Sequence, residues 1–172
     1  PDTLFTGGTT LTEGVVAGHD GMIYFSDITF TFLGRQAGSV EAGHIWRYNP
    51  ETGKTKIFRS PSGMSNGIKF DARGRMIVAR GADYGGRSVI RTDMSSGKSG
   101  IIAGLYKERP FNSPNDITID EKGRIYFSDP RYLGHEPVDQ PVMAVYRIDL
   151  DGSIHRIITD AGKPNGVCVS PD

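Results

Sequence analysis

The sequence is poor in cysteine, in clustered positive charge and in long apolar runs. Its single cysteine, Cys168, excludes an internal disulfide and leaves the redox compartment open. The 20 basic and 20 acidic side chains cancel, and no run of lysine and arginine could neutralise a row of phosphates, so we expect no nucleic-acid partner. No apolar stretch approaches the length of a membrane-spanning helix, and no signal-peptide pattern occurs in these residues. We therefore expect a soluble protein without a membrane partner. Its compartment (cytoplasmic, or periplasmic or secreted) and its oligomeric state stay open.

Helical periodicity is missing as well. No segment repeats apolar residues at the spacing of three and four that an amphipathic helix needs. The 172 residues are enough to bury a core, and the 23 glycines recur at turn-like positions. These features predict an all-β fold with many tight turns.

A unit that recurs about every fifty residues is present instead. Four segments align, and Glu13, Asn66, Asn115 and Asn165 fall in register at intervals of 53, 49 and 50 positions. Each of the first three copies starts with one of these polar residues and continues as two strands around a tight turn, as in PNDITIDEKGRIYFSD, whereas the fourth covers only the first strand. Cys168 falls on the first strand of the last copy, so we expect it to be buried. A period near fifty with short strands is typical of β-propeller blades, which have four strands each.

The second half of each unit supplies two more strands around a glycine-containing turn. We therefore predict a single propeller domain with blades at about residues 13–60, 66–104 and 115–160, and the first strand of a fourth blade at 164–172. Three and a quarter blades cannot close a ring of roughly four to eight. We expect the 172 residues to be a piece of a longer chain; closure by a second copy is the alternative.

Loop lengths predict where a site would lie. The turns inside the hairpins are tight, whereas the connections between the second and third strands are long, at residues 28–43, 81–87 and 130–143. In an up-and-down sheet these long connections share a face with the start of each first strand. The polar residues in register should therefore ring the mouth of the central channel, beneath the long loops.

Two interpretations of the residues in register stay open. One carboxylate with several amide oxygens suits calcium, and magnesium, manganese or zinc are also possible. Alternatively, Glu13 is an ordinary surface carboxylate and the asparagines are turn formers. We favour ligands for Glu13, Asn115 and Asn165. Asn66 lacks a preceding proline and suits a structural role better, and we keep it only as a candidate substrate contact. Asp116 either orients Asn115 next to a substrate or is a turn residue.

The connection after the second strand of the third unit offers further candidates. Arg131 could bind an oxyanion or sugar hydroxyls, Tyr132 could contact the same substrate, and His135 could carry a proton. The alternative is an ordinary polar loop stiffened by prolines, which we favour slightly for His135. Neither a serine-hydrolase elbow nor a phosphate-binding loop occurs.

Three motifs together resemble a known family. The stretches TEGVV at 12–16, NSPNDITIDEKGRIYFSDPRYLG at 112–134 and PNGVCVSPD at 164–172 are similar to those of the gluconolactonase/senescence-marker-protein (regucalcin) family. That resemblance implies a six-bladed β-propeller with calcium or another divalent ion at the channel mouth. It also implies that Glu13 and Asn165 are metal ligands and that Asn115 touches metal or substrate. A further family ligand, an aspartate of the fifth blade, has no counterpart among these residues.

The resemblance further implies a metal-dependent lactonase that opens a sugar-type lactone such as gluconolactone, with Glu13 and Asn115 as catalytic candidates. The general base would be the fifth-blade aspartate or, second, Glu13. The same site could act on a phosphotriester or another ester. A propeller without catalysis that binds a ligand, a protein or regulatory calcium is the alternative from a different class.

Overall fold

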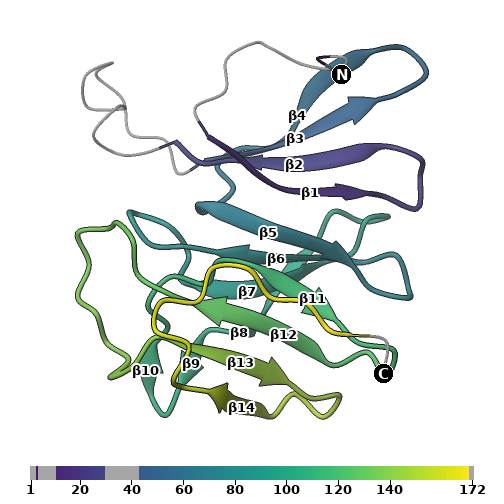
Figure 1. The fold of residues 1–172 in the computed structure, drawn as a ribbon. Helices are drawn as coiled ribbons and strands as arrows, with labels where there is room; N and C mark the ends of the chain where they lie inside the picture. The colour runs from purple at the N-terminus through teal and green to yellow at the C-terminus, as the bar shows by residue number, and fades with distance from the viewer. Residues whose placement is uncertain (1–2, 4–10, 30–42, 171–172) are drawn as a thin grey trace.

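The computed structural model describes residues 3, 11–29 and 43–170, and every regular element within them is a β-strand (Figure 1). Most of the long connection predicted at 28–43 lies outside these ranges, as do the last two residues of the chain. None of the described residues forms a helix that is long and apolar enough to cross a membrane.

Three antiparallel sheets of four strands follow one another along the chain, each in the order of its sequence. Blade one contains β1 (Thr12–Ala17), β2 (Ile23–Asp27), β3 (His44–Asn49) and β4 (Lys54–Arg59). Blade two contains β5 (Ser65–Phe70), β6 (Met76–Arg80), β7 (Ser88–Thr92) and β8 (Ser99–Ala103). A small hairpin, β9 (Leu105–Tyr106) and β10 (Arg109–Pro110), leads to blade three, which contains β11 (Ile117–Ile119), β12 (Ile125–Asp129), β13 (Ala144–Ile148) and β14 (Ile154–Ile158). The predicted all-β propeller fold is confirmed.

The sheets form because apolar and polar residues alternate along strands that end at tight turns. In β12, Ile125 and Phe127 are buried on one side of the sheet, while Tyr126 is only partly buried. The turns between first and second strands need a positive φ, and glycine provides it at Gly74 (71°) and Gly123 (83°). These local signals explain why the sheets could be predicted from the sequence.

Neighbouring blades pack through aromatic and aliphatic side chains. Between blades two and three, Phe111, Phe127 and Tyr146 form a cluster with ring centroids 5.0–5.4 Å apart. Between blades one and two, Tyr24 packs with Ile68 and its neighbours. The apolar core therefore lies between the sheets and leaves the ends of the strands available for polar groups.

The innermost strands β1, β5 and β11 approach one another closely (Figure 1). A Cβ on Gly14 would overlap the carbonyl oxygen of Asn66, and Gly14 also has a φ of 57° in the bulge that follows Glu13. The backbone N–H of Gly67 donates to the carbonyl of Asn115 at 2.7 Å. Glycine at these positions brings the starts of successive blades into direct contact.

The strand predicted at 164–172 does not form within the described part of that segment, residues 164–170. A strand needs a hydrogen-bonded neighbour on its own sheet, and the described residues provide none here. The segment instead lies against blade three, where the N–H of Val167 donates to Asp116 Oδ2 at 2.9 Å. Cys168 is consequently exposed, and the prediction that it is buried is wrong.

Candidate active site at the starts of the inner strands

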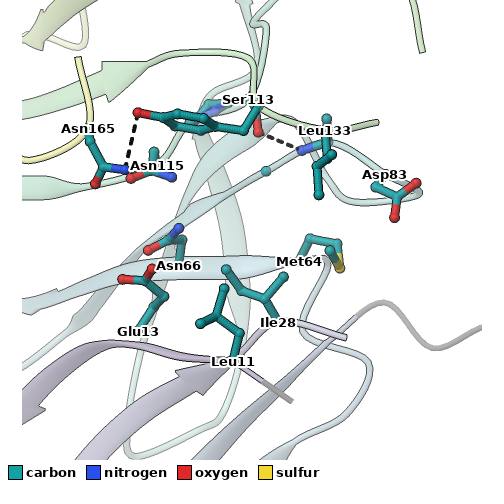
Figure 2. A pocket seen from close by; sticks show the side chains of 14 residues that line it. Leu11, Glu13, Ile28, Met64, Asn66, Asp83, Ser113, Asn115, Leu133 and Asn165 are labelled. Atoms are coloured by element: carbon teal, nitrogen blue, oxygen red, sulfur yellow. Dashed lines mark hydrogen bonds between the residues drawn. The ribbon is translucent and has the colours of Figure 1, made fainter. Parts of the chain in front are cut away.

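A cavity of about 220 Å³ opens where the starts of the inner strands meet the long connections, and we call it the central cavity. It has a polar end, where Glu13, Asn66, Asn115 and Asn165 gather, and a more apolar end that leads toward Asp83 (Figure 2). The described residues that line it are Leu11, Glu13, Ile28, Met64, Asn66, Gly81, Ala82, Asp83, Ser113, Pro114, Asn115, Tyr132, Leu133 and Asn165.

The four polar residues in register reach this cavity from four segments. Glu13 comes from β1 just before its bulge, and Asn66 comes from β5. Asn115 precedes β11, and Asn165 follows β14 in the segment that lies against blade three. Residues about fifty positions apart therefore meet because each stands at the same point of its unit.

A hydrogen bond from the preceding blade holds the backbone of each asparagine. The donor is a side-chain hydroxyl in two cases and a backbone N–H in the third. Ser26 Oγ donates to the Asn66 carbonyl at 2.8 Å, Gly67 N to that of Asn115 at 2.7 Å and Ser128 Oγ to that of Asn165 at 2.5 Å. The spacing between the side chains of the site is therefore set by contacts between blades.

The side chains differ in how they are held. Asn165 Nδ2 donates to the hydroxyl of Tyr132 at 3.2 Å, which orients the amide (Figure 2). Among the described residues, no side-chain hydrogen bond partner exists for Glu13, Asn66 or Asn115, although Asn66 is only 7% exposed. The carboxylate of Glu13 and these two amides are thus available to a bound molecule or ion.

The other end of the central cavity is apolar. Ile28 and Met64 are buried, whereas Leu11 and Leu133 are about half exposed at its edge. The arrangement suits a small ligand with one polar reacting centre and a carbon skeleton.

Five of the eight residues that the sequence predicted for the site line the central cavity, namely Glu13, Asn66, Asn115, Tyr132 and Asn165. The other three do not. Asp116 accepts the N–H of Val167 and so anchors the segment that carries Asn165. Arg131 donates to the carbonyls of Glu136 and Pro137 at 2.9 Å each, because it folds back on its own loop instead of facing the cavity.

His135 packs its ring on Tyr84, with centroids 3.8 Å apart, and is roughly half exposed. Its Nδ1 lies 3.5 Å from Asp83 Oδ1, so it contacts a lining residue without lining the cavity itself. Stacking and this polar contact explain its position.

Sequence reasoning missed Asp83 and its support, Glu136. Asp83 and Tyr84 have φ values of 67° and 65°, which non-glycine residues rarely adopt. The carboxylate of Glu136 accepts both of their N–H groups at 2.9 Å. Burial acts to raise the pKa of Glu136, but these hydrogen bonds outweigh it and the pKa lies below its usual value. The only sequence signal for this contact was the length of the connections at residues 81–87 and 130–143.

Asp129 is a third carboxylate that sequence reasoning did not single out. It is fully buried beside the central cavity and accepts the N–H groups of Asn112 at 2.9 Å and Ser113 at 2.7 Å. Burial raises its pKa to about 6, against the lowering effect of these bonds and of Arg87 and Arg131. Asp27 holds Leu11 N in the equivalent place of blade one, at 3.2 Å.

The donor set at the polar end fits a hard divalent cation. Glu13 offers a carboxylate, and the asparagines offer amide oxygens, which are calcium ligands in proteins. No group of three histidine, cysteine, aspartate or glutamate side chains that could bind a metal occurs among the described residues, so the set provides little charge by itself.

Comparison with known proteins adds three findings. Residues 11–172 match the model of the SMP-30/Gluconolactonase/LRE-like region. A gluconolactonase of Zymomonas mobilis is 34% identical over 121 residues, which are 67% of this chain and 32% of that protein. A pentonolactonase of Haloferax volcanii is 27% identical over 139 residues, or 77% of this chain and 40% of that protein. The chain thus spans about a third to two fifths of these relatives.

Solved structures give the same picture of the fold. The X-ray structure of a candidate gluconolactonase superposes with a TM-score of 0.78 at 28% identity, covering 95% of this chain and 53% of that one. A gluconolactonase from Xanthomonas campestris superposes with a TM-score of 0.72 at 24% identity, covering 88% of this chain and 48% of that one. The second likeness concerns the fold alone.

Proposed function

The chain belongs to the SMP-30/gluconolactonase/LRE-like family, and from this membership we propose that its protein hydrolyses a sugar-type lactone at the central cavity. One observation supports the proposal above others: Glu13, Asn66, Asn115 and Asn165 converge on one cavity from four segments of the chain. A propeller that only binds proteins has no need for such convergence. The relatives named gluconolactonase and pentonolactonase favour lactones over other esters.

We further propose that a calcium ion, or magnesium, manganese or zinc in its place, binds at the polar end with Glu13, Asn115 and Asn165 as protein ligands. When bound, such an ion polarises a carbonyl and stabilises negative charge that develops on its oxygen. The hydrogen bond from Asn165 to Tyr132 restricts rotation of that amide. The bonds between blades keep the asparagine backbones at fixed spacing, so the site needs little reorganisation.

The described residues also suggest how the substrate is placed. Amide groups of Asn66 and Asn115 can hydrogen-bond the hydroxyls of a sugar ring, and the apolar end can contact its carbon skeleton. In hydrolysis, water adds to the lactone carbonyl, the ring C–O bond breaks and the ring oxygen takes up a proton. Glu13 and Asp83 are the carboxylates among the described lining residues, so they are the candidates here to accept the proton of the attacking water.

The test is a substrate panel assayed with the full-length protein, with proton release as the readout. Five- and six-carbon aldonolactones should be hydrolysed faster than an aryl ester or a phosphotriester, and chelation should abolish turnover until a divalent cation is restored. Faster phosphotriester turnover would replace the lactonase assignment by the alternative esterase. Cation binding without turnover of any substrate would identify a binding or regulatory propeller.

A further inference from the structure

Two arginines line a second depression, which shares no lining residue with the central cavity. It has a volume of about 450 Å³ and lies between the end of blade one and the outer strands of blade two; we call it the interblade groove. Arg59 at the end of β4 and Arg80 at the end of β6 both line it, together with Ser62, Ser99, Ile90 and Ile101.

The two arginines bind hydroxyls instead of carboxylates. Arg59 Nη2 donates to Thr92 Oγ1 at 3.1 Å and to Ser99 Oγ at 2.9 Å. Arg80 donates from Nε and Nη2 to Ser88 Oγ at 3.1 and 2.7 Å. Hydroxyls orient a guanidinium group but do not neutralise it, so two positive charges stay uncompensated within the described part of the groove.

Other arginines of the described residues differ in their partners. Six lie within 4.0 Å of a carboxylate, namely Arg75, Arg87, Arg91, Arg124, Arg131 and Arg147. Arg156, in contrast, donates to the neutral oxygens of Tyr146 and Gln140. Burial lowers the pKa of Arg59 and Arg80, and the charge of Arg59 lowers that of Arg80 further. A guanidinium group keeps its charge at neutral pH, so the repulsion between the two arginines persists unless an anion enters.

The repeat shows that the charge at Arg80 is a departure from the pattern of the blades. In register with it stand Asp27 of blade one and Asp129 of blade three, both buried carboxylates at the end of the second strand. Blade two reverses the charge at this position. Two glycines make room for the Arg80 side chain. A Cβ on Gly86 would overlap its guanidinium group, and a Cβ on Gly63 would lie 3.0 Å from Arg80 Cδ.

We propose that the interblade groove binds a phosphate group, either as free phosphate or as the head of a phosphate monoester. Guanidinium forks match the oxygens of phosphate, and two positive charges suit a dianion. The Nη1 groups of both arginines have no hydrogen-bond partner among the described residues, so they can donate to a ligand. Ile90 and Ile101 provide an apolar wall for the carbon part of a monoester. This site is separate from the central cavity and does not depend on lactone hydrolysis.

Calorimetric titration with inorganic phosphate and with a sugar monophosphate, at constant ionic strength, tests the proposal. Saturable binding should weaken at least tenfold in Arg59→Gln and Arg80→Gln. It should stay within twofold in Arg147→Gln, which removes the same charge from a surface pair with Asp149. Tighter binding of the sugar monophosphate identifies a monoester ligand, and equal binding identifies free phosphate. Absence of saturable binding, or equal weakening in all three variants, would overturn the proposal.

If a groove variant fails to fold, the proposal can still be tested on the wild-type protein. Phosphate titrated into isotopically labelled protein should shift the backbone amide resonances of Ser62 and Ser99, which line the groove. The amide of Glu51, in an exposed turn of blade one, should not move. Shifts confined to other parts of the chain would contradict the assignment as firmly as the loss of variant effects.

Discussion

The hydroxyl of Ser128 donates a hydrogen bond to the backbone carbonyl of Asn165, 37 positions later in the chain. Ser26 makes the same bond to the carbonyl of Asn66, 40 positions later. Each serine belongs to the second strand of one blade, and each asparagine to the start of the next unit. The propeller repeat thus places the polar groups of the central cavity and also holds them there.

Ser128→Ala should increase the mobility of Asn165 but should not abolish the central cavity's site. The substitution removes the bond to Asn165 and also the bond that Ser128 Oγ accepts from Asp116 N at 3.1 Å, so it should cost roughly 1–3 kcal/mol of unfolding free energy. Because Asn165 is a proposed metal ligand, cation affinity should fall as well. Ser26→Ala is the control, since it removes the equivalent bond to Asn66. It should cost less stability than Ser128→Ala, because it loses one hydrogen bond instead of two, and it should affect cation affinity less. Chemical denaturation and cation titration measure the two quantities; equal cation affinity in both variants would refute the special role of Asn165.

Glu13→Gln keeps the size of the side chain and removes the carboxylate charge at the polar end of the cavity. We expect lactone kcat/KM to fall by roughly 100-fold or more, because electrostatic stabilisation of the reacting centre is lost. Cation binding followed by calorimetry should weaken in parallel. Glu51→Gln, an exposed carboxylate in a turn of blade one, should change neither quantity. Wild-type turnover in Glu13→Gln would exclude the proposed site.

Tyr132→Phe removes the hydroxyl that accepts the hydrogen bond from Asn165 at 3.2 Å. The amide should then rotate more freely, and cation affinity should fall by about threefold to tenfold, the range expected for one partly exposed hydrogen bond. Thermal stability should change little because Tyr132 is 47% exposed. Tyr126→Phe loses a comparable bond to Asp120 in the hairpin of blade three and should leave affinity unchanged. A strongly destabilised Tyr132→Phe would show a structural role instead.

Glu136→Gln should release the loop that carries Asp83. The two N–H groups bind different oxygens of Glu136, and glutamine has an NH2 donor in place of one of them, so opening of this loop should become easier by roughly 1–2 kcal/mol. Amide hydrogen exchange at Asp83 and Tyr84 measures the effect. Since the pKa of Glu136 is lowered, its support is complete above its ordinary value of 4.5 and is lost as pH falls through the depressed value. Unchanged exchange at both amides would contradict the prediction.

Asp129 should titrate near neutral pH. Its pKa is raised to about 6 from 3.8, so the folded state binds a proton that the unfolded state has released. Its contribution to unfolding free energy should therefore be largest below about pH 4, decline as pH rises to about 6 and stay constant above that. A carboxyl ¹³C titration by NMR gives the midpoint directly. A midpoint at or below 4 would show that the hydrogen bonds from Asn112 and Ser113 outweigh burial.

Much of the fold could be predicted because its signals are local. Alternation along segments such as residues 125–129, and glycine at the turns, specify strands and hairpins without reference to distant residues. The repeat then places Glu13 and the three asparagines at equivalent points. Residues 164–170 do not form the strand expected there, because strand formation depends on a neighbouring strand and not on alternation alone; the start of a fourth blade at 164–172 stays a prediction.

The candidate site was predictable only where the repeat marks it. Arg131 looked like a substrate contact because it follows a strand end, yet its guanidinium satisfies two carbonyls of its own loop. Asp83 has no counterpart in the other units, so no comparison within the sequence could single it out. Its place at the cavity depends on Glu136, 53 positions later. Long irregular connections have no periodicity from which contacts can be read.

By itself the sequence determined the strands, the turns, their repetition and the position of one polar residue at the start of each unit, because these depend on side-chain alternation and backbone preference. The tertiary structure alone decided which polar groups face the central cavity and which serve the scaffold. It also brought Arg59 and Arg80 to one groove whose described lining residues include no carboxylate. Such outcomes depend on which groups the packing of blades and loops leaves unsatisfied, and that balance is set only when distant segments meet.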